Sequence, residues 1–394
     1  MKNDHIAFIS HPQYPHVGPV LPILSVLIRR GYRVTCVTSN QFASRVRQIG
    51  AEWVECPRVP TLTHEDAVNE EVGREGADNP TVRLASDVLR IASAFYENDR
   101  PALILYDYAA IAGRVLARRY GIPAVKTSPM FAHVRPEFAL QVPDEGFRHA
   151  ILEYGAQIDR YLEQCGIAAP DWVFHREALN IYLFPRVLQP GAVGSDERCY
   201  YAGRCPGEQP YYGNWQKSDS GGRPIVLVGT STHYVRGPEY FKMCIKALSA
   251  LQWHVILSIG DSGDPKAFDP LPPHVEIVQH TSHVRILPHV SLYVCLGGII
   301  TSAEAAYHGI PLIVTTHGFQ ELEWEGENLA RVGVGIHLRK ADTSAESLRA
   351  SALRICADQA MHRRVREVQR LTRAEPGSEE AANRIEEYLE RHSE

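Results

Sequence analysis

The sequence predicts an α/β protein made of two doubly wound, Rossmann-like domains that face each other across a cleft. The first observation is length, because 394 residues exceed what one ordinary hydrophobic core supports. The second is the alternation of short β-branched runs with segments of helical periodicity, which indicates parallel sheets with crossover helices. The third is that this alternation stops in a polar stretch near residue 206 and then starts again.

In the first half of the chain, β-branched and aromatic runs predict five strands. Their ranges are 5–10, 33–38, 102–106, 123–127 and 180–184. Between the first two, VLPILSVLIRRGY has the apolar spacing of an amphipathic helix and closes on Gly31. Residues 1–205 are therefore expected to form the first domain.

Residues 206–222, PGEQPYYGNWQKSDSGG, are rich in Pro, Gly and Ser and are expected to form the linker. The second domain, 223–375, has six predicted strands. Their ranges are 224–228, 254–259, 275–279, 291–295, 311–315 and 334–338. The tail, 376–394, is predicted to be a charged amphipathic helix that packs back on the first domain.

Composition excludes several classes of function. The net charge is −5 and no basic block is present, so a nucleic-acid partner is not expected. No apolar run reaches the roughly 18 residues of a membrane span. The eight cysteines form no CxxC pair and no Cys/His cluster at metal-ligand spacing, which favours reduced thiols in a cytoplasmic protein. Nothing in the sequence indicates an oligomeric state.

Two polar residues follow predicted strands of the first domain, where ligands of open α/β sheets bind. His16 lies between the first strand and the first helix, and Asp107 comes directly after the strand 102–106. A neutral imidazole can accept a proton near neutral pH, and a carboxylate on its other nitrogen would orient it. His16 and Asp107 are therefore a candidate base and orienting acid. The alternative is that they only cap a helix and bind backbone N–H groups.

In the second domain, two Gly/Ser/Thr turns follow strands and suggest a diphosphate site. One turn consists of Gly229, Thr230 and Ser231. The other has Gly297 and Gly298, preceded by Leu296 and followed by Thr301, Ser302 and Glu304. Neither is a P-loop, because no Lys follows at the required spacing. An ordinary αβ turn is the alternative.

A polar loop after the strand 311–315 offers Gln320 and Glu321 as partners for sugar hydroxyls, or only as a solvated acidic loop. Nearby, His280, His283 and His289 lack the carboxylate or cysteine pattern of a zinc site. No metal is therefore expected.

Taken together, these segments resemble the glycosyltransferase family 1 enzymes, the GT-B-fold class that includes macrolide and natural-product glycosyltransferases. The resemblance is carried by residues 5–53, 101–129, 225–231 and 286–335. The last range is the most specific, because its strand, Gly-Gly turn, Glu304, HGIP and later polar loop come in family order.

The resemblance implies an inverting, metal-independent transfer of a sugar from a UDP- or dTDP-linked donor to a hydroxyl of a small-molecule acceptor. The nucleotide sugar would be a co-substrate, and no cofactor is implied. By this resemblance His16 is the general base, Asp107 orients it, the first domain binds the acceptor and the second binds the donor. Donor-binding positions would be Gly229, Thr230, Ser231, His280, Thr281, His283, Leu296, Gly297, Gly298, Thr301, Ser302, Glu304, Gln320 and Glu321.

The acceptor is expected to contact the variable stretches 60–95 and 130–170. Their aromatic residues Phe131, Phe138 and Tyr154 suggest an apolar or aromatic acceptor, although they could also belong to the core.

The chain departs from the family pattern at its donor motifs. Leu296 stands where the family has a phosphate-contacting histidine, and Ile300 stands in place of asparagine. His280 to His283 replace the aromatic-x-Pro-Gln segment, and Gln320-Glu321 reverse the acid-Gln pair. These changes favour an unusual donor, such as a dTDP-deoxysugar. They also leave open a non-catalytic relative that binds a nucleotide sugar or assists another transferase. A GT-B enzyme of different chemistry, such as an epimerase, would need further acids.

Overall fold

The computed structural model describes most of the chain. The described ranges are 4–59, 79–130, 145–168, 175–189, 196–203, 215–217, 219–230, 236–260, 263–279, 283–316 and 320–392. These residues form two compact units. The first unit holds the described residues up to 203 together with 376–392, and the second holds those from 215 to 375.

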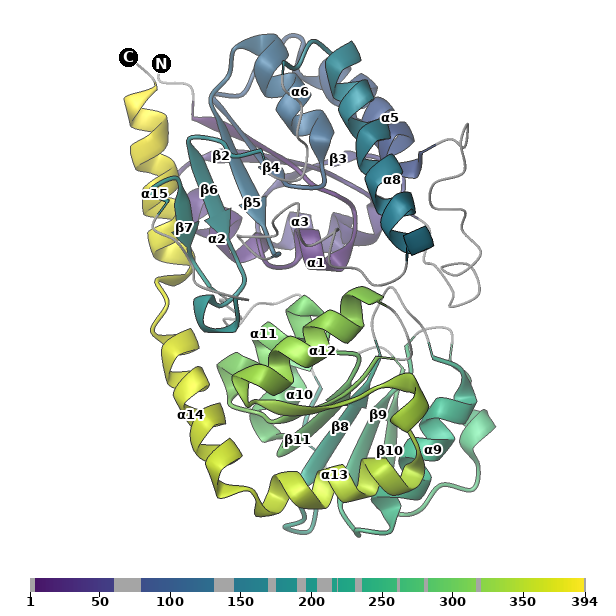
Figure 1. Cartoon of the computed structure of the whole chain (residues 1–394). Coiled ribbons are helices and arrows are strands. Elements are labelled where there is room, and N and C mark those ends of the chain that lie inside the picture. The colour runs from purple at the N-terminus through teal and green to yellow at the C-terminus, as the bar shows by residue number, and fades with distance from the viewer. Residues whose placement is uncertain are drawn as a thin grey trace. The chain divides into compact units, whose positions relative to one another are not determined.

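The first unit is built on a parallel sheet of seven strands in the order β3-β2-β1-β4-β5-β6-β7 (Figure 1). The strands are β1 His5–Ile9, β2 Arg33–Thr38, β3 Glu52–Glu55, β4 Leu103–Asp107, β5 Ala124–Ser128, β6 Leu179–Tyr182 and β7 Cys199–Tyr201. Strands β1, β4 and β5 are buried along their whole length, as expected for a sheet that helices cover on both faces.

Most helices of this unit lie in the connections between its parallel strands. They are α1 Tyr14–Val17, α2 Leu21–Arg29, α3 Ala43–Gln48, α5 Pro80–Tyr96, α6 Ile111–Tyr120, α8 Glu145–Gln164 and α15 Gly377–Arg391. On one face, Ala7, Ile9, Ile104 and Tyr106 form a buried core with apolar side chains of α5 and α6. Helix α8 packs on α5 in turn.

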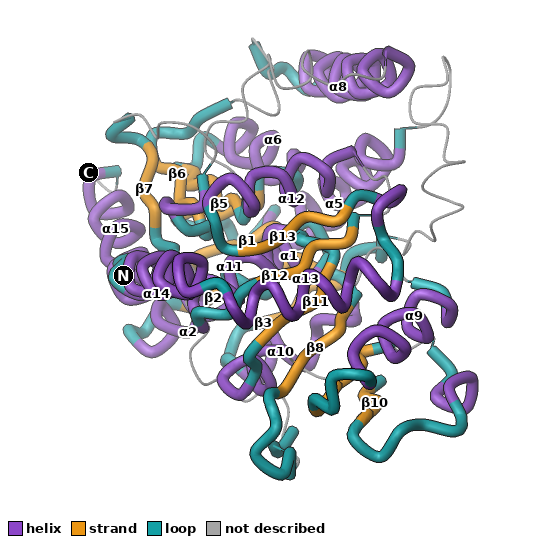
Figure 2. The backbone as a smooth tube through the Cα atoms, turned by 60° about the horizontal axis from the view of Figure 1, so that its bottom comes forward, coloured by secondary structure: helices purple, strands orange, loops and turns teal. Residues whose placement is uncertain are grey.

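The second unit has a parallel sheet of six strands in the order β10-β9-β8-β11-β12-β13. The strands are β8 Ile225–Gly229, β9 His254–Ser258, β10 Val275–Val278, β11 Leu292–Cys295, β12 Leu312–Thr315 and β13 Gly335–Leu338. Its helices are α9 Pro238–Ser249, α10 His283–Ile286, α11 Ile299–His308, α12 Gln320–Val332, α13 Ala345–Ala357 and α14 Gln359–Arg373. Figure 2 shows the strands of both units as orange segments between purple helices.

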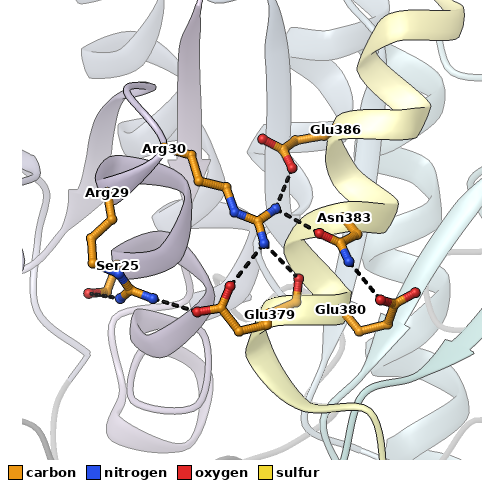
Figure 3. Close-up of polar contacts among 7 residues, drawn as sticks. All are labelled: Ser25, Arg29, Arg30, Glu379, Glu380, Asn383 and Glu386. Carbon is orange, nitrogen blue, oxygen red and sulfur yellow. Dashed lines mark hydrogen bonds and ion pairs between the residues drawn. The ribbon is translucent and has the colours of Figure 1, made fainter.

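Helix α15 belongs to the first unit, where it lies beside α2 (Figure 1). The side chains of Ala381, Ala382 and Ile385 are buried, and Arg30 forms hydrogen bonds with polar side chains of α15 (Figure 3). Arg30 donates to Glu379 at 2.9 Å, to the Asn383 side chain at 2.8 Å and to Glu386. These hydrogen bonds join α15 to the C-terminal end of α2.

The predicted strands are all present; the strand 33–38 matches β2 without a shift, and the ends of the others differ by at most two residues. Asp107 is consequently the last residue of β4 instead of the residue after it. The sequence missed two strands, β3 and β7, which lie at the two edges of the first sheet. They are short and only partly buried, so their apolar signal is weak. No described helix has the length and apolar character that a membrane span requires.

Candidate functional site

Each sheet has one point at which the direction of strand addition reverses. In the first sheet it lies between β1 and β4, which are parallel neighbours, and in the second between β8 and β11. Crossover helices leave such a point toward opposite faces and open a crevice at the carboxyl ends of the strands. Several candidate residues lie at these two points, namely His16 and Asp107 in the first unit and Gly229, Gly297 and Gly298 in the second.

At the first point, His16 and Asp107 are in direct contact. Nδ1 of His16 and Oδ1 of Asp107 are 2.9 Å apart. The Asp107 side chain is 0% exposed at the end of β4, while the His16 side chain is 12% exposed in the turn of helix α1. The fold brings these residues together because β1 and β4 run parallel side by side.

The contact fixes the state of the imidazole. A carboxylate only accepts hydrogen bonds, so Nδ1 of His16 carries a proton, and in the neutral imidazole the lone pair is therefore on Nε2. Oδ1 of Asp107 also accepts the backbone N–H of Ala109 at 2.9 Å, which holds the carboxylate in place. The pair can therefore take up a proton at Nε2 and stabilise the imidazolium that forms.

Aromatic rings and an apolar hollow surround the pair. The ring of His11 lies 4.8 Å from that of His16, and the ring of Tyr108 lies 5.6 Å away. Beside them is a hollow lined by Ser10, His11, Thr81, Leu84, Ala85, Val88 and residues 109–112. Four of these residues, Thr81, Leu84, Ala85 and Val88, lie in α5, within the stretch 60–95 that was expected to contact the acceptor, although none of them was predicted individually.

Of the predicted acceptor residues, Tyr154 lies in α8 and forms a hydrogen bond with the hydroxyl of Thr81, which lines the hollow. Tyr154 also packs against the buried cluster around Ile158 and Ile111. Phe131 and Phe138 lie outside the described residues.

At the second point, the Gly-Gly turn leads from β11 into α11. Gly297 has φ of +81°, and a Cβ there would lie 2.6 Å from Cγ1 of Val314. Gly298 caps the helix, and a Cβ at that position would meet no atom within 4 Å. The backbone is thus open to close approach at a helix N-terminus, where free N–H groups favour an anion.

The side chains of this turn are arranged less simply than the sequence suggested. Leu296 is 2% exposed, and Glu304 is also buried. The hydroxyl of Ser302 donates to the carbonyls of Gly298 at 3.2 Å and Ile299 at 3.0 Å, so its proton is used inside the helix. Thr301 forms a hydrogen bond with Tyr293.

A hydrogen-bonded network links Thr301, through Tyr293, to His283. Nδ1 of His283 is 2.8 Å from the Tyr293 hydroxyl, and Nε2 is 2.9 Å from the Ser258 hydroxyl. Gly229 makes room for the network, since a Cβ there would lie 2.9 Å from the Tyr293 oxygen. Burial raises the pKa of Tyr293 well above its usual value, so the phenol stays protonated. Tyr293 was not among the predicted site residues, because it occupies an ordinary position in the strand β11.

The remaining predicted donor residues are only partly described. Thr230 directly follows β8 and is half-buried. Ser231, His280, Thr281 and the side chains of Gln320 and Glu321 lie outside the described residues. Among the side chains that are described, no group of three or more His, Cys, Asp or Glu is placed to hold a metal ion.

Beside the polar loop, a further histidine has a structural partner. Nε2 of His337 lies 3.1 Å from both the Glu323 carboxylate and the Thr316 hydroxyl. The Thr316 hydroxyl also donates to Glu323. This triad ties the start of α12 to β13.

Comparison with known proteins places the chain among glycosyltransferases. Residues 242–388 match the family model described as erythromycin biosynthesis protein CIII-like, C-terminal domain. The oleandomycin glycosyltransferase of Streptomyces antibioticus is 30% identical over 98% of this chain and 91% of its own length. The NDP-glycosyltransferase YjiC of Bacillus licheniformis is 29% identical over 99% of this chain and 98% of its own.

Among solved structures, the calicheamicin glycosyltransferase CalG4 matches with a TM-score of 0.80 and 30% identity, covering 100% of both chains. The fold, the order of the motifs and the full-length similarity agree with one another. The chain belongs to the natural-product branch of the family 1 glycosyltransferases, which have the GT-B fold.

Proposed function

We propose that this glycosyltransferase moves a sugar from a nucleotide-sugar donor to a hydroxyl of a small natural-product acceptor, with inversion at the anomeric carbon. The observation that carries the proposal is the 2.9 Å hydrogen bond between His16 and Asp107 at the switch point of the first sheet. Further support comes from a hollow lined mainly by apolar side chains and by His11, whose ring lies 4.8 Å from that of His16.

In the proposed reaction, the acceptor hydroxyl gives its proton to Nε2 of His16 as its oxygen attacks the anomeric carbon. The new C–O bond forms as the bond between that carbon and the diphosphate breaks. Asp107 stabilises the positive charge that develops on the imidazole ring. The nucleoside diphosphate leaves with the bonding electron pair.

The leaving diphosphate would be held by the second unit. Support comes from the open Gly297-Gly298 turn and the N-terminal N–H groups of α11. We propose that transfer needs no metal ion and no cofactor, because this turn supplies hydrogen-bond donors to the developing charge. Activity that is unchanged by a chelator would support this part, and activity that requires an added divalent cation would contradict it.

The donor is proposed to be linked to UDP or dTDP. A nucleotide-sugar donor is supported by the relatives, one of which is named an NDP-glycosyltransferase. Antibiotic glycosyltransferases among them support a natural-product acceptor and a role in antibiotic biosynthesis.

A panel of UDP- and dTDP-sugars, each incubated with and without aromatic or macrolide acceptors, tests the proposal. Release of nucleoside diphosphate that depends on an acceptor, with a glycosylated product seen by mass spectrometry, is the expected result. Donor binding without transfer across the panel would favour the non-catalytic alternative, in which the protein binds a nucleotide sugar or assists another transferase.

A further inference from the structure

Arg236 lies at the switch point of the second sheet and is part of no motif in the sequence. It follows β8 and precedes α9, and its Nη2 donates to the carbonyl of Thr315 at 2.8 Å. Thr315 ends β12, and its hydroxyl donates to the carbonyl of Cys295, the last residue of β11, at 3.4 Å. The guanidinium therefore lies over the carboxyl ends of these strands, close to the turn that begins after Cys295.

The charge of this arginine is not balanced within the described residues. It forms no ion pair with any described carboxylate, and its contacts are a carbonyl and the ring of Tyr240, 4.9 Å from the guanidinium carbon. Its Nε is buried and makes no hydrogen bond with a described residue. Burial lowers the pKa of Arg236 to about 10, which still leaves it charged at neutral pH.

A desolvated guanidinium without an anionic partner is costly, and a planar fork of N–H groups matches a phosphate or carboxylate. The Tyr240 hydroxyl lies 2.8 Å from Oγ1 of Thr315, so the ring under Arg236 is itself anchored to β12. The guanidinium therefore packs on a ring that is itself fixed by a hydrogen bond, as expected of a preorganised anion contact. Leu296, at the same strand ends, supplies no charge.

We propose that Arg236 binds the β-phosphate of the nucleoside diphosphate and thereby supplies the cationic contact that Leu296 cannot. This inference rests on the proposed function and adds a residue to its donor site. The shared chemistry is an oxyanion, and a second source would be the carboxylate of a uronic acid sugar in the donor.

Calorimetric titration of wild type and Arg236→Gln with UDP, UMP, dTDP and dTMP separates the phosphates. The expected result is a loss of about 10- to 100-fold in affinity for the diphosphates, with monophosphate affinity nearly unchanged. Arg339→Gln is the matched control, since Arg339 is a 64% exposed arginine of the same unit that pairs with Glu327. Arg236→Lys should recover part of the loss because it keeps the charge.

Unchanged diphosphate affinity in folded Arg236→Gln would overturn the inference. So would an equal loss for mono- and diphosphates, which would mark a structural role or an α-phosphate contact. The same titration is made with UDP-glucose and UDP-glucuronate. A loss seen only with UDP-glucuronate would assign the oxyanion to the sugar carboxylate and would also overturn the inference. Because these are binding measurements, they succeed or fail independently of whether the wild type transfers a sugar.

Discussion

The two switch points of the molecule meet different chemical demands. At the first, one imidazole nitrogen must lie at one place, and a single buried carboxylate fixes it at 2.9 Å. At the second, we propose that an anion is held by several donors, of which the backbone N–H groups at the Gly297-Gly298 turn need no particular side chain. A site of the second kind can have a leucine at position 296 instead of a histidine and still keep its backbone donors. A site of the first kind cannot lose its histidine, because that side chain is itself the proposed base.

His16→Ala should have the largest effect. Removing the proposed base should lower kcat by about 10²- to 10⁴-fold, because proton transfer by a positioned side chain contributes that much. Donor affinity should stay within about twofold, since His16 lies in the first unit, which is proposed to bind the acceptor. Steady-state kinetics and calorimetry measure the two quantities, with His362→Ala in α14 as the control. A large loss of donor affinity would contradict this division of labour.

Asp107→Asn should come next, with a fall in kcat of about 100-fold. The amide keeps the size of the carboxylate but lacks the charge that stabilises the imidazolium, and it can hold the ring in the wrong tautomer. Kinetics at saturating donor, together with thermal unfolding, check this expectation. A variant that loses stability but keeps the kcat of wild type would reduce Asp107 to a structural residue.

Tyr293→Phe tests the network of the second unit and should act on binding. It removes the hydroxyl that hydrogen-bonds both His283 and Thr301. If about 1 kcal/mol of this lost energy bears on the donor site, diphosphate affinity should fall roughly fivefold. Tyr106→Phe is the matched control, since the Tyr106 hydroxyl donates to Glu177 at 2.7 Å in the first unit. That variant should lose stability only; equal effects of both variants on donor affinity would contradict the comparison.

Leu296→His should have the smallest effect on function. Leu296 is 2% exposed, so the imidazole would enter an apolar environment and destabilise the unit by about 1–3 kcal/mol. We expect no tighter diphosphate binding, whereas Leu296→Met should leave both stability and binding nearly unchanged. Tenfold tighter binding by Leu296→His would show that the turn had merely lost a contact.

The sequence best predicted which polar residues lie near the carboxyl ends of the central strands. His16 and Asp107 could be paired in advance because each follows a clear apolar run, and the carboxyl ends of parallel strands meet at one edge. Arg236 and Tyr293 could not be found in this way. Arg236 lies just before α9 and belongs to no sequence motif, and Tyr293 has the position of an ordinary core residue in a strand. Arg236 contacts Thr315, which lies 79 residues further along the chain. Tyr293 contacts His283, which belongs to a helix and not to a neighbouring strand.

The lining of the hollow shows the same limit. Thr81 and Leu84 belong to a helix whose apolar periodicity predicts packing but not what it packs beside. The edge strands β3 and β7 escaped prediction because they have few buried positions. Long-range placement, rather than local propensity, decided each of these cases.

The anomeric configuration of the product tests the central claim most directly. With an α-linked nucleotide sugar from the donor panel, attack by a hydroxyl that His16 deprotonates must occur in line and give a β-linked product, which proton NMR of the purified glycoside identifies. Inversion is the predicted result. An α-linked product would contradict the account, because retention does not follow from a single displacement assisted by His16 and Asp107.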